Sequence, residues 1–234
     1  HASEAPGTHL IENQSALPDR SHWAFQPVRR PDVPVVRNVQ WVQTPIDAFV
    51  LAKLEQTGLA PAPRADRSVL LRRLYLDLIG LPPTPEEQRA FLDDSSPNGL
   101  EKVVDGLLAR PEYGQRWARH WLDAVRYAES NGYERDGAKP HVWRYRDYVI
   151  DSLNRDKPYD RFVLEQLAGD ELEGSDAETQ IATTFLRLGT WDDEPAEFTR
   201  DRCEQLDDML GATATVFLGL TLRCARCHDH KFEP

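Results

Sequence analysis

The chain has 234 residues, 40% of them hydrophobic and 29% charged, and 28 Lys and Arg against 39 Asp and Glu give a formal net charge of −11. A chain of this length forms one large domain or two small ones and buries a core without metals or disulfides. The acidic balance argues against nucleic-acid binding, which needs a basic face. The longest apolar stretch, residues 214–222, is too short to span a bilayer, and three cysteines are too few for a disulfide scaffold.

Residues 1–43 are predicted to form an extended N-terminal arm, because prolines recur through them and aromatic residues at Trp23, Phe25 and Trp41 could anchor it. No signal peptide is visible at the start, which fits a mature exported chain or a trimmed one. The chain ends at Pro234, directly after its densest chemical motif. We therefore expect it to be part of a longer protein.

From Thr44 onward, apolar residues recur with the spacing of helices and no run alternates as a strand would, so residues 44–234 are predicted to be a multi-helix, all-α domain. The first helix is expected to begin at Thr44 and to end at Gly58, with an apolar stripe of Ile46, Phe49, Val50 and Leu54. Further helices are expected over residues 68–79, from 84, over 98–109, 111–130, 140–154 and 159–167, from 175 and over 197–218.

Two of these helices are expected to begin with a capping box. The pairs are Thr84 with Glu87 and Ser175 with Glu178, each a hydroxyl followed three residues later by a glutamate. Both pairs precede an apolar periodic segment, so each predicts a helix start.

The sequence Cys224-Ala225-Arg226-Cys227-His228 is a CxxCH motif, the attachment signature of c-type haem. Two thiols three positions apart on one helical turn can add to the two vinyl groups of a porphyrin. The imidazole of His228 would then be the proximal iron ligand. The motif therefore predicts covalent haem c.

Two rival interpretations of the motif stay open. Zinc could be bound by Cys224, Cys227, His228 and His230, although structural zinc sites use a second ligand pair that this chain lacks, Cys203 being isolated. The second rival interpretation is a redox-active pair of thiols, Cys224 and Cys227. Such a pair usually follows a strand of a βαβ unit, and no such unit is predicted here.

Several separate blocks of the chain resemble the planctomycete cytochrome-associated family called PSCyt2, or DUF1549. They are His22-Trp-Ala-Phe-Gln-Pro-Val28, Leu74-Tyr-Leu-Asp-Leu-Ile-Gly-Leu-Pro-Pro-Thr-Pro85, Trp117-Ala-Arg-His-Trp-Leu-Asp123, Trp143-Arg-Tyr-Arg-Asp-Tyr148, Lys157-Pro-Tyr-Asp-Arg-Phe162, Glu165-Gln-Leu-Ala-Gly-Asp170 and Val216-Phe-Leu-Gly-Leu-Thr-Leu-Arg-Cys-Ala-Arg-Cys-His-Asp-His-Lys-Phe-Glu-Pro234. The resemblance implies a large exported protein, often with a cytochrome-like domain before this region and a DUF1553 domain after it. It strengthens the expectation of haem and implies no particular reaction.

The second axial ligand of such a haem decides between electron transfer and catalysis. His120, on the aromatic segment 111–130, is ranked first, ahead of Met209, the only methionine. Packing in the core is the competing interpretation for both residues. A ligand from outside this chain or an open position is also compatible with the sequence, whereas His230 is tethered too closely to His228 to reach the opposite face.

Three further features suggest weaker hypotheses. The segment from Glu129 to Gly137 resembles a loose calcium loop but lacks the full EF-hand pattern, so a solvated turn competes with a calcium site. The acidic pair Asp207 and Asp208 could do acid–base work or simply face solvent. Arg223, Arg226 and Lys231 surround the motif with positive charge, which could pair with haem propionates or attract an acidic partner.

The sequence thus predicts an exported, periplasmic c-type cytochrome-like module that transfers electrons to a fused downstream domain or a redox partner protein. A haem enzyme with an open distal site and a structural zinc module are the alternatives. No nucleic-acid partner and no transmembrane segment are expected in this chain.

Overall fold

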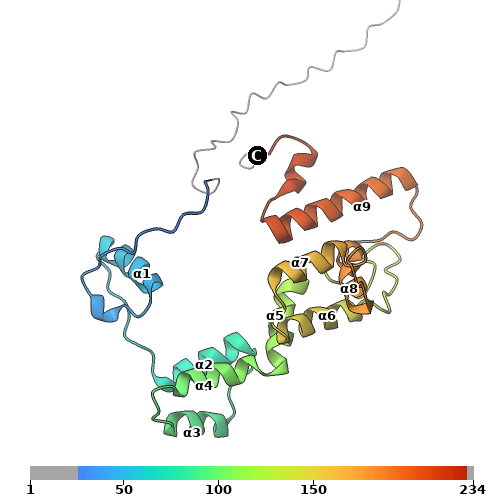
Figure 1. Ribbon diagram of the computed structural model, residues 1–234. Helices are drawn as coiled ribbons and strands as arrows, with labels where there is room; N and C mark the ends of the chain where they lie inside the picture. Colours follow the sequence, from blue (N-terminus) through green and yellow to red (C-terminus); the bar gives the residue numbers. More distant parts are fainter. Residues whose placement is uncertain (1–25, 231–234) are drawn as a thin grey trace, which may run out of the picture. The chain divides into compact units, whose positions relative to one another are not determined.

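A computed structural model describes residues 26–230, which form helices joined by loops (Figure 1). Within that range the only strand-like pairing is an isolated bridge between Ser130 and Ala138. The all-α prediction is confirmed. The expected anchors Trp23 and Phe25 lie outside the described residues. The chain divides into two compact units, residues 1–66 and residues 67–234, which are described separately.

The described part of the first unit contains one α-helix, α1 (Pro45–Gln56), preceded by a 3-10 turn, η2 (Val39–Trp41). Residues 26–38 have no regular secondary structure. The Glu55 carboxylate fastens this segment to α1, because it accepts hydrogen bonds from the backbone N–H groups of Arg37 at 2.9 Å and Asn38 at 3.3 Å. The predicted start of α1 is confirmed: Thr44 and Asp47 form its capping box.

Most of the predicted apolar stripe of α1 lies at the surface of the first unit. The buried residues of α1 are Ala48 and Leu51, whereas Ile46, Phe49 and Val50 are exposed. The helical spacing of the apolar residues does not distinguish the buried face of α1 from its exposed face, because apolar residues occur on more than one side of this short helix.

The second unit begins with a three-helix layer of α2 (Arg67–Leu78), α3 (Pro85–Asp93) and α4 (Gly99–Leu108) (Figure 1). Its core is formed by buried residues of the three helices and by the residue that follows α2. They are Leu71, Tyr75, Ile79, Phe91 and Leu107. The predicted box at the start of α3 is confirmed, since Thr84 accepts from Glu87 N and the Glu87 carboxylate accepts from Thr84 N.

The larger core of the second unit lies among the remaining helices: α5 (Pro111–Ala124), α6 (Trp143–Asn154), α7 (Tyr159–Ala168), α8 (Ala177–Ala182) with the 3-10 turn η3 (Thr183–Arg187), and α9 (Phe198–Thr213). Its largest fully buried side chains are Tyr145 and Phe185. Trp121 of α5 donates from Nε1 to the Tyr145 hydroxyl and to Gln166 Oε1, both at 3.1 Å. The polar atoms of this aromatic core are therefore hydrogen-bonded to one another.

The predicted box at the start of α8 is wrong in its members. Asp176 is the N-cap and pairs with Thr179, one residue later than the predicted Ser175 and Glu178. Glu178 instead binds Arg155 at 3.0 Å and Lys157 at 2.8 Å, two cations that precede it by more than 20 residues in the chain.

None of the helices in residues 26–230 combines the length and the apolar character that crossing a bilayer requires.

Candidate functional site

The CxxCH motif follows α9 through two short helical turns. A π-helical turn, η4 (Ala214–Leu218), continues α9 and ends at Gly219, whose φ of 67° is in the left-handed region. Leu220 N then donates to Ala214 O at 3.1 Å, which turns the chain back. The 3-10 turn η5 (Leu222–Arg226) follows and contains the first cysteine of the motif.

Two arginines of η5 bind the middle of α9. Arg223 lies 2.5 Å from Asp208, and Arg226 lies 3.2 Å from Asp207. Gly211, one turn further along α9, leaves room for the first of them, because a Cβ there would lie 2.7 Å from Arg223 Cγ. The motif is thus attached to α9 by Arg226, which belongs to it, and by Arg223, which directly precedes it.

This attachment was not predicted from the sequence. The sequence suggests that Arg223 and Arg226 pair with haem propionates or attract an acidic partner, and that Asp207 and Asp208 do acid–base work or face solvent. The structure pairs the two arginines with the two aspartates. Asp208 also binds Arg126 at 2.7 Å, so it connects α9 to both η5 and the end of α5.

The two motif cysteines are exposed free thiols, as is Cys203. Cys227 is the C-cap of η5, and its N–H points to Cys224 O at 3.5 Å. Residues i and i+3 of a 3-10 turn lie nearly above one another. Arg223 and Arg226 therefore form one row, which contacts α9, and Cys224 and Cys227 form the next row.

The imidazole of His228 is oriented by its neighbour. Its Nδ1 lies 2.8 Å from the backbone oxygen of Asp229. A carbonyl oxygen only accepts, so Nδ1 is the donor in this contact, and in the neutral form of the ring the lone pair is on Nε2. His230 differs, since its Nε2 lies 2.9 Å from Thr221 Oγ1.

Aromatic side chains hold the segment before the motif against the core. The ring of Phe217 in η4 lies 5.8 Å from that of Trp121 in α5 and 5.2 Å from that of Phe185 in η3. The elements that carry the motif are therefore packed on the larger core of the second unit.

The two candidate distal ligands lie in different surroundings. His120 is an exposed residue of α5, and its ring meets Trp117 edge-on at 5.4 Å, so the interpretation as a core histidine is wrong. Met209 is half-buried on α9 and lines a small hollow with Arg187 and Trp191. Which of them, if either, ligates iron stays a prediction.

Several polar groups of the calcium-like loop are hydrogen-bonded within the protein. Asp136 Oδ1 accepts from Gly132 N at 2.8 Å, and Glu129 accepts from the Tyr127 hydroxyl at 3.1 Å. Asn131 Nδ2 donates to Asp193, and this bond and the bidentate pair of Arg135 and Glu194 fasten the loop to residues 193–194. Calcium binding there stays a prediction.

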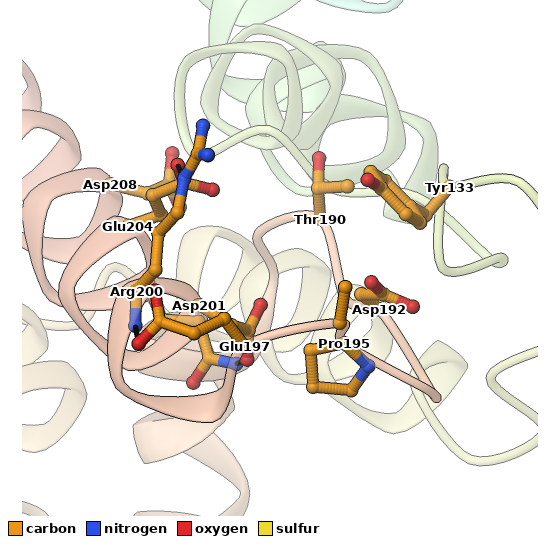
Figure 2. A pocket seen from close by; sticks show the side chains of 11 residues that line it. Tyr133, Thr190, Asp192, Pro195, Glu197, Arg200, Asp201, Glu204 and Asp208 are labelled. Carbon is orange, nitrogen blue, oxygen red and sulfur yellow. Dashed lines mark hydrogen bonds and ion pairs between the residues drawn. The ribbon is translucent and has the colours of Figure 1, made fainter.

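An acidic pocket of about 390 Å³ lies beside the first half of α9 (Figure 2). Figure 2 shows α9 side chains on one side of it and Tyr133 and Thr190 across from them. Its acids already have roles in the fold: Glu197 caps α9 at Arg200 N, and Glu204 binds the Arg200 side chain at 3.0 Å. Across residues 26–230, no three His, Cys, Asp or Glu side chains converge as a metal site.

The residues of the motif are those that covalent haem attachment uses. Attachment needs two accessible thiols and an imidazole beside them, and the motif presents the exposed thiols of Cys224 and Cys227 and the exposed imidazole of His228.

A protein-family model described as PSCyt2, a protein of unknown function (DUF1549), matches residues 45–234. Comparisons with curated proteins and with solved structures gave no match.

Proposed function

The chain belongs to the PSCyt2 (DUF1549) family, and from this premise we propose that it is an exported c-type haem module that transfers electrons to a fused domain or a partner protein. The observation that supports the proposal most directly is the pair of exposed thiols on one 3-10 turn, followed by an imidazole whose Nδ1 proton is held by a carbonyl. The bound haem would supply one-electron transfer at its iron.

The motif residues have distinct tasks in this proposal. Cys224 and Cys227 would hold the haem through two thioether bonds, each formed by addition of an S–H across one vinyl C=C bond with the hydrogen passing to the adjoining carbon, so that no electrons would be gained or lost. His228 offers Nε2 to the iron, while its Nδ1–H bond to Asp229 O fixes the ring and its tautomer, as is usual for metal-binding histidines. Arg223 and Arg226 hold the turn on α9.

The test is covalent haem content after production in an exporting host that has haem-attachment machinery. We expect one covalent haem per chain in a pyridine haemochrome spectrum and by intact mass. Cys224→Ala and Cys227→Ala should each lose stable attachment, whereas Cys203→Ala, a matched control outside the motif, should keep it. All three variants should keep the helical circular dichroism of the parent, because no residue of the motif is buried.

Two results would overturn the proposal. One is a parent chain made under these conditions with no covalent haem and a stoichiometric amount of zinc, which would favour the structural zinc alternative. The other is a haem-loaded chain with a five-coordinate, high-spin spectrum that turns over peroxide, since an open distal position favours catalysis over electron transfer.

A further inference from the structure

We propose that the attached haem lies along an exposed apolar stripe of α9, formed by Cys203, Leu206 and Leu210. This set is called the α9 stripe below. The inference rests on the proposed function and adds to it a binding surface for one face of the ring.

The α9 stripe is apolar surface in contact with solvent. Leu206 is 48% exposed and Leu210 is 59% exposed, and Cys203 is a free, exposed thiol. The three residues follow one another at spacings of three and four, so they occupy one side of the helix. The opposite side of α9 is buried through Ala212, which belongs to the larger core.

The motif is fastened directly beside this stripe. Asp207, the partner of Arg226, is four residues after Cys203 and three before Leu210, so it lies at the edge of the stripe. Arg223 binds the other neighbour, Asp208, and crosses Gly211. From Arg223 to Arg226 the turn therefore runs across α9 toward the stripe.

The second cysteine directly follows the arginine that reaches the edge of the stripe. Cys227 comes after Arg226, which binds Asp207, and both motif thiols are exposed. With His228 on one face of a ring joined to both thiols, the other flat apolar face is left to cover, and the α9 stripe is exposed apolar surface beside Asp207, the partner of Arg226.

The tether also favours the haem over other occupants of the stripe. A covalently attached group has an effective concentration in the millimolar range, whereas a second copy or a partner protein must be recruited from solution. Burial of apolar area stabilises the contact by about 25 cal/mol per Å². The structure thus assigns the stripe to the group held beside it.

The test uses the thiol of Cys203 as a reporter of coverage. In the loaded chain Cys203 is the only free thiol, and in Cys224→Ala/Cys227→Ala, which cannot be loaded, it is again the only one. We expect a maleimide to label Cys203 about tenfold more slowly in the loaded chain, because a covered thiol reacts slowly. The matched control is Leu92→Cys with Cys203 kept, since Leu92 is 43% exposed on α3; peptide mass spectrometry reads each thiol separately, and the introduced thiol should react at the same rate with and without haem.

The outcomes separate this inference from the proposed function. Haem attached at one per chain with unchanged labelling of Cys203 overturns the inference and leaves the proposed function standing. Absence of covalent haem overturns the proposed function first. Protection of Cys203 that rises with protein concentration in the unloaded variant overturns the inference in favour of a second copy.

A second variant tests the two leucines directly. In loaded Leu206→Gln/Leu210→Gln we expect haem content to stay at one per chain, while labelling of Cys203 recovers most of the rate seen in the unloaded chain. Leu92→Gln is the control and should leave the protection intact. If the double variant keeps full protection, the leucines do not hold the ring and the inference is wrong.

Discussion

Glu165 shows how single residues of this protein combine burial with charge. It is only 4% exposed, yet its carboxylate receives Lys157 Nζ at 2.5 Å, Arg161 Nε at 2.7 Å and the Tyr148 hydroxyl at 2.9 Å. Burial raises the pKa of Glu165, but the hydrogen bonds from Lys157 and Arg161 outweigh burial and leave the pKa below its usual value. The charged form is therefore the native one.

We predict that Glu165→Gln lowers the free energy of unfolding by about 3 kcal/mol, because it leaves the buried Lys157 with only one carboxylate, Glu178. Urea denaturation followed by circular dichroism measures the change. Glu86→Gln is a suitable control, since its pair with Arg89 is exposed on both sides and should contribute less than about 1 kcal/mol.

The same variant should change the pH dependence of stability. A carboxylate whose pKa is lower in the folded state than in the unfolded state stabilises the folded state at every pH above its unfolded-state pKa. This stabilisation is lost as the pH falls through its folded-state pKa. The difference in stability between parent and Glu165→Gln should thus be constant above the ordinary value of 4.5 and shrink below it. A difference that does not change between pH 6 and strongly acid pH would contradict the charged assignment.

At the scale of elements, helix starts were predictable where the capping residues are local. Thr44 with Asp47 and Thr84 with Glu87 need only their own first turn to pair, and both boxes formed. At α8 a local box also formed, but between Asp176 and Thr179, one residue after the predicted pair, while Glu178 binds Arg155 and Lys157 at the end of α6 and in the loop after it. A sequence pattern contains no information on such distant partners.

The close contact of α5 with α6 depends on Gly114, which no sequence motif marks. Gly114 N donates to Asn154 Oδ1 at 2.8 Å, and a Cβ on Gly114 would lie 2.6 Å from both that oxygen and the backbone oxygen of Ile150. The two helices approach closely only because this Cβ is missing.

We predict that Gly114→Ala destabilises the protein by about 2 kcal/mol, since the clash with a backbone oxygen exceeds the gain of about 1 kcal/mol in helix propensity. Gly106→Ala on α4 is the matched control: no atom lies within 4 Å of its added Cβ, so it should stabilise by roughly 0.5–1 kcal/mol. Thermal unfolding should give a lower Tm than that of the parent for Gly114→Ala and a higher one for Gly106→Ala. Equal stabilisation by both would show that α5 and α6 are not in close contact.

At the scale of the whole molecule, the chemical motif was visible in the sequence but its setting was not. Cys224, Cys227 and His228 can be found from their spacing alone. Their attachment to α9 depends on Asp207, Asp208 and Gly211; the two aspartates stand out in the sequence only as an acidic pair, and nothing there indicates that they bind Arg226 and Arg223. Those residues contact η5 only because the turn at Gly219 brings η5 back to α9.

The boundary between the two parts of the chain also differs with the criterion. Helical periodicity predicts a domain from residue 44 and the family match begins at residue 45, whereas the compact units meet between Asp66 and Arg67. The helix α1 lies in the first unit although its sequence is as helical as the rest. Periodicity detects helices and not the core to which each belongs.

We predict that residues 67–234 fold without residues 1–66. Both core clusters of the second unit are built from residues between Leu71 and Phe217, so removing the first unit should change the free energy of unfolding by less than about 1 kcal/mol. The measurement is urea unfolding followed by circular dichroism, with the chain from Pro45 to Pro234 as the matched control that retains α1. If the longer chain unfolds cooperatively and the shorter one does not, α1 belongs to the cooperative unit and the boundary lies at residue 44, as the sequence predicts.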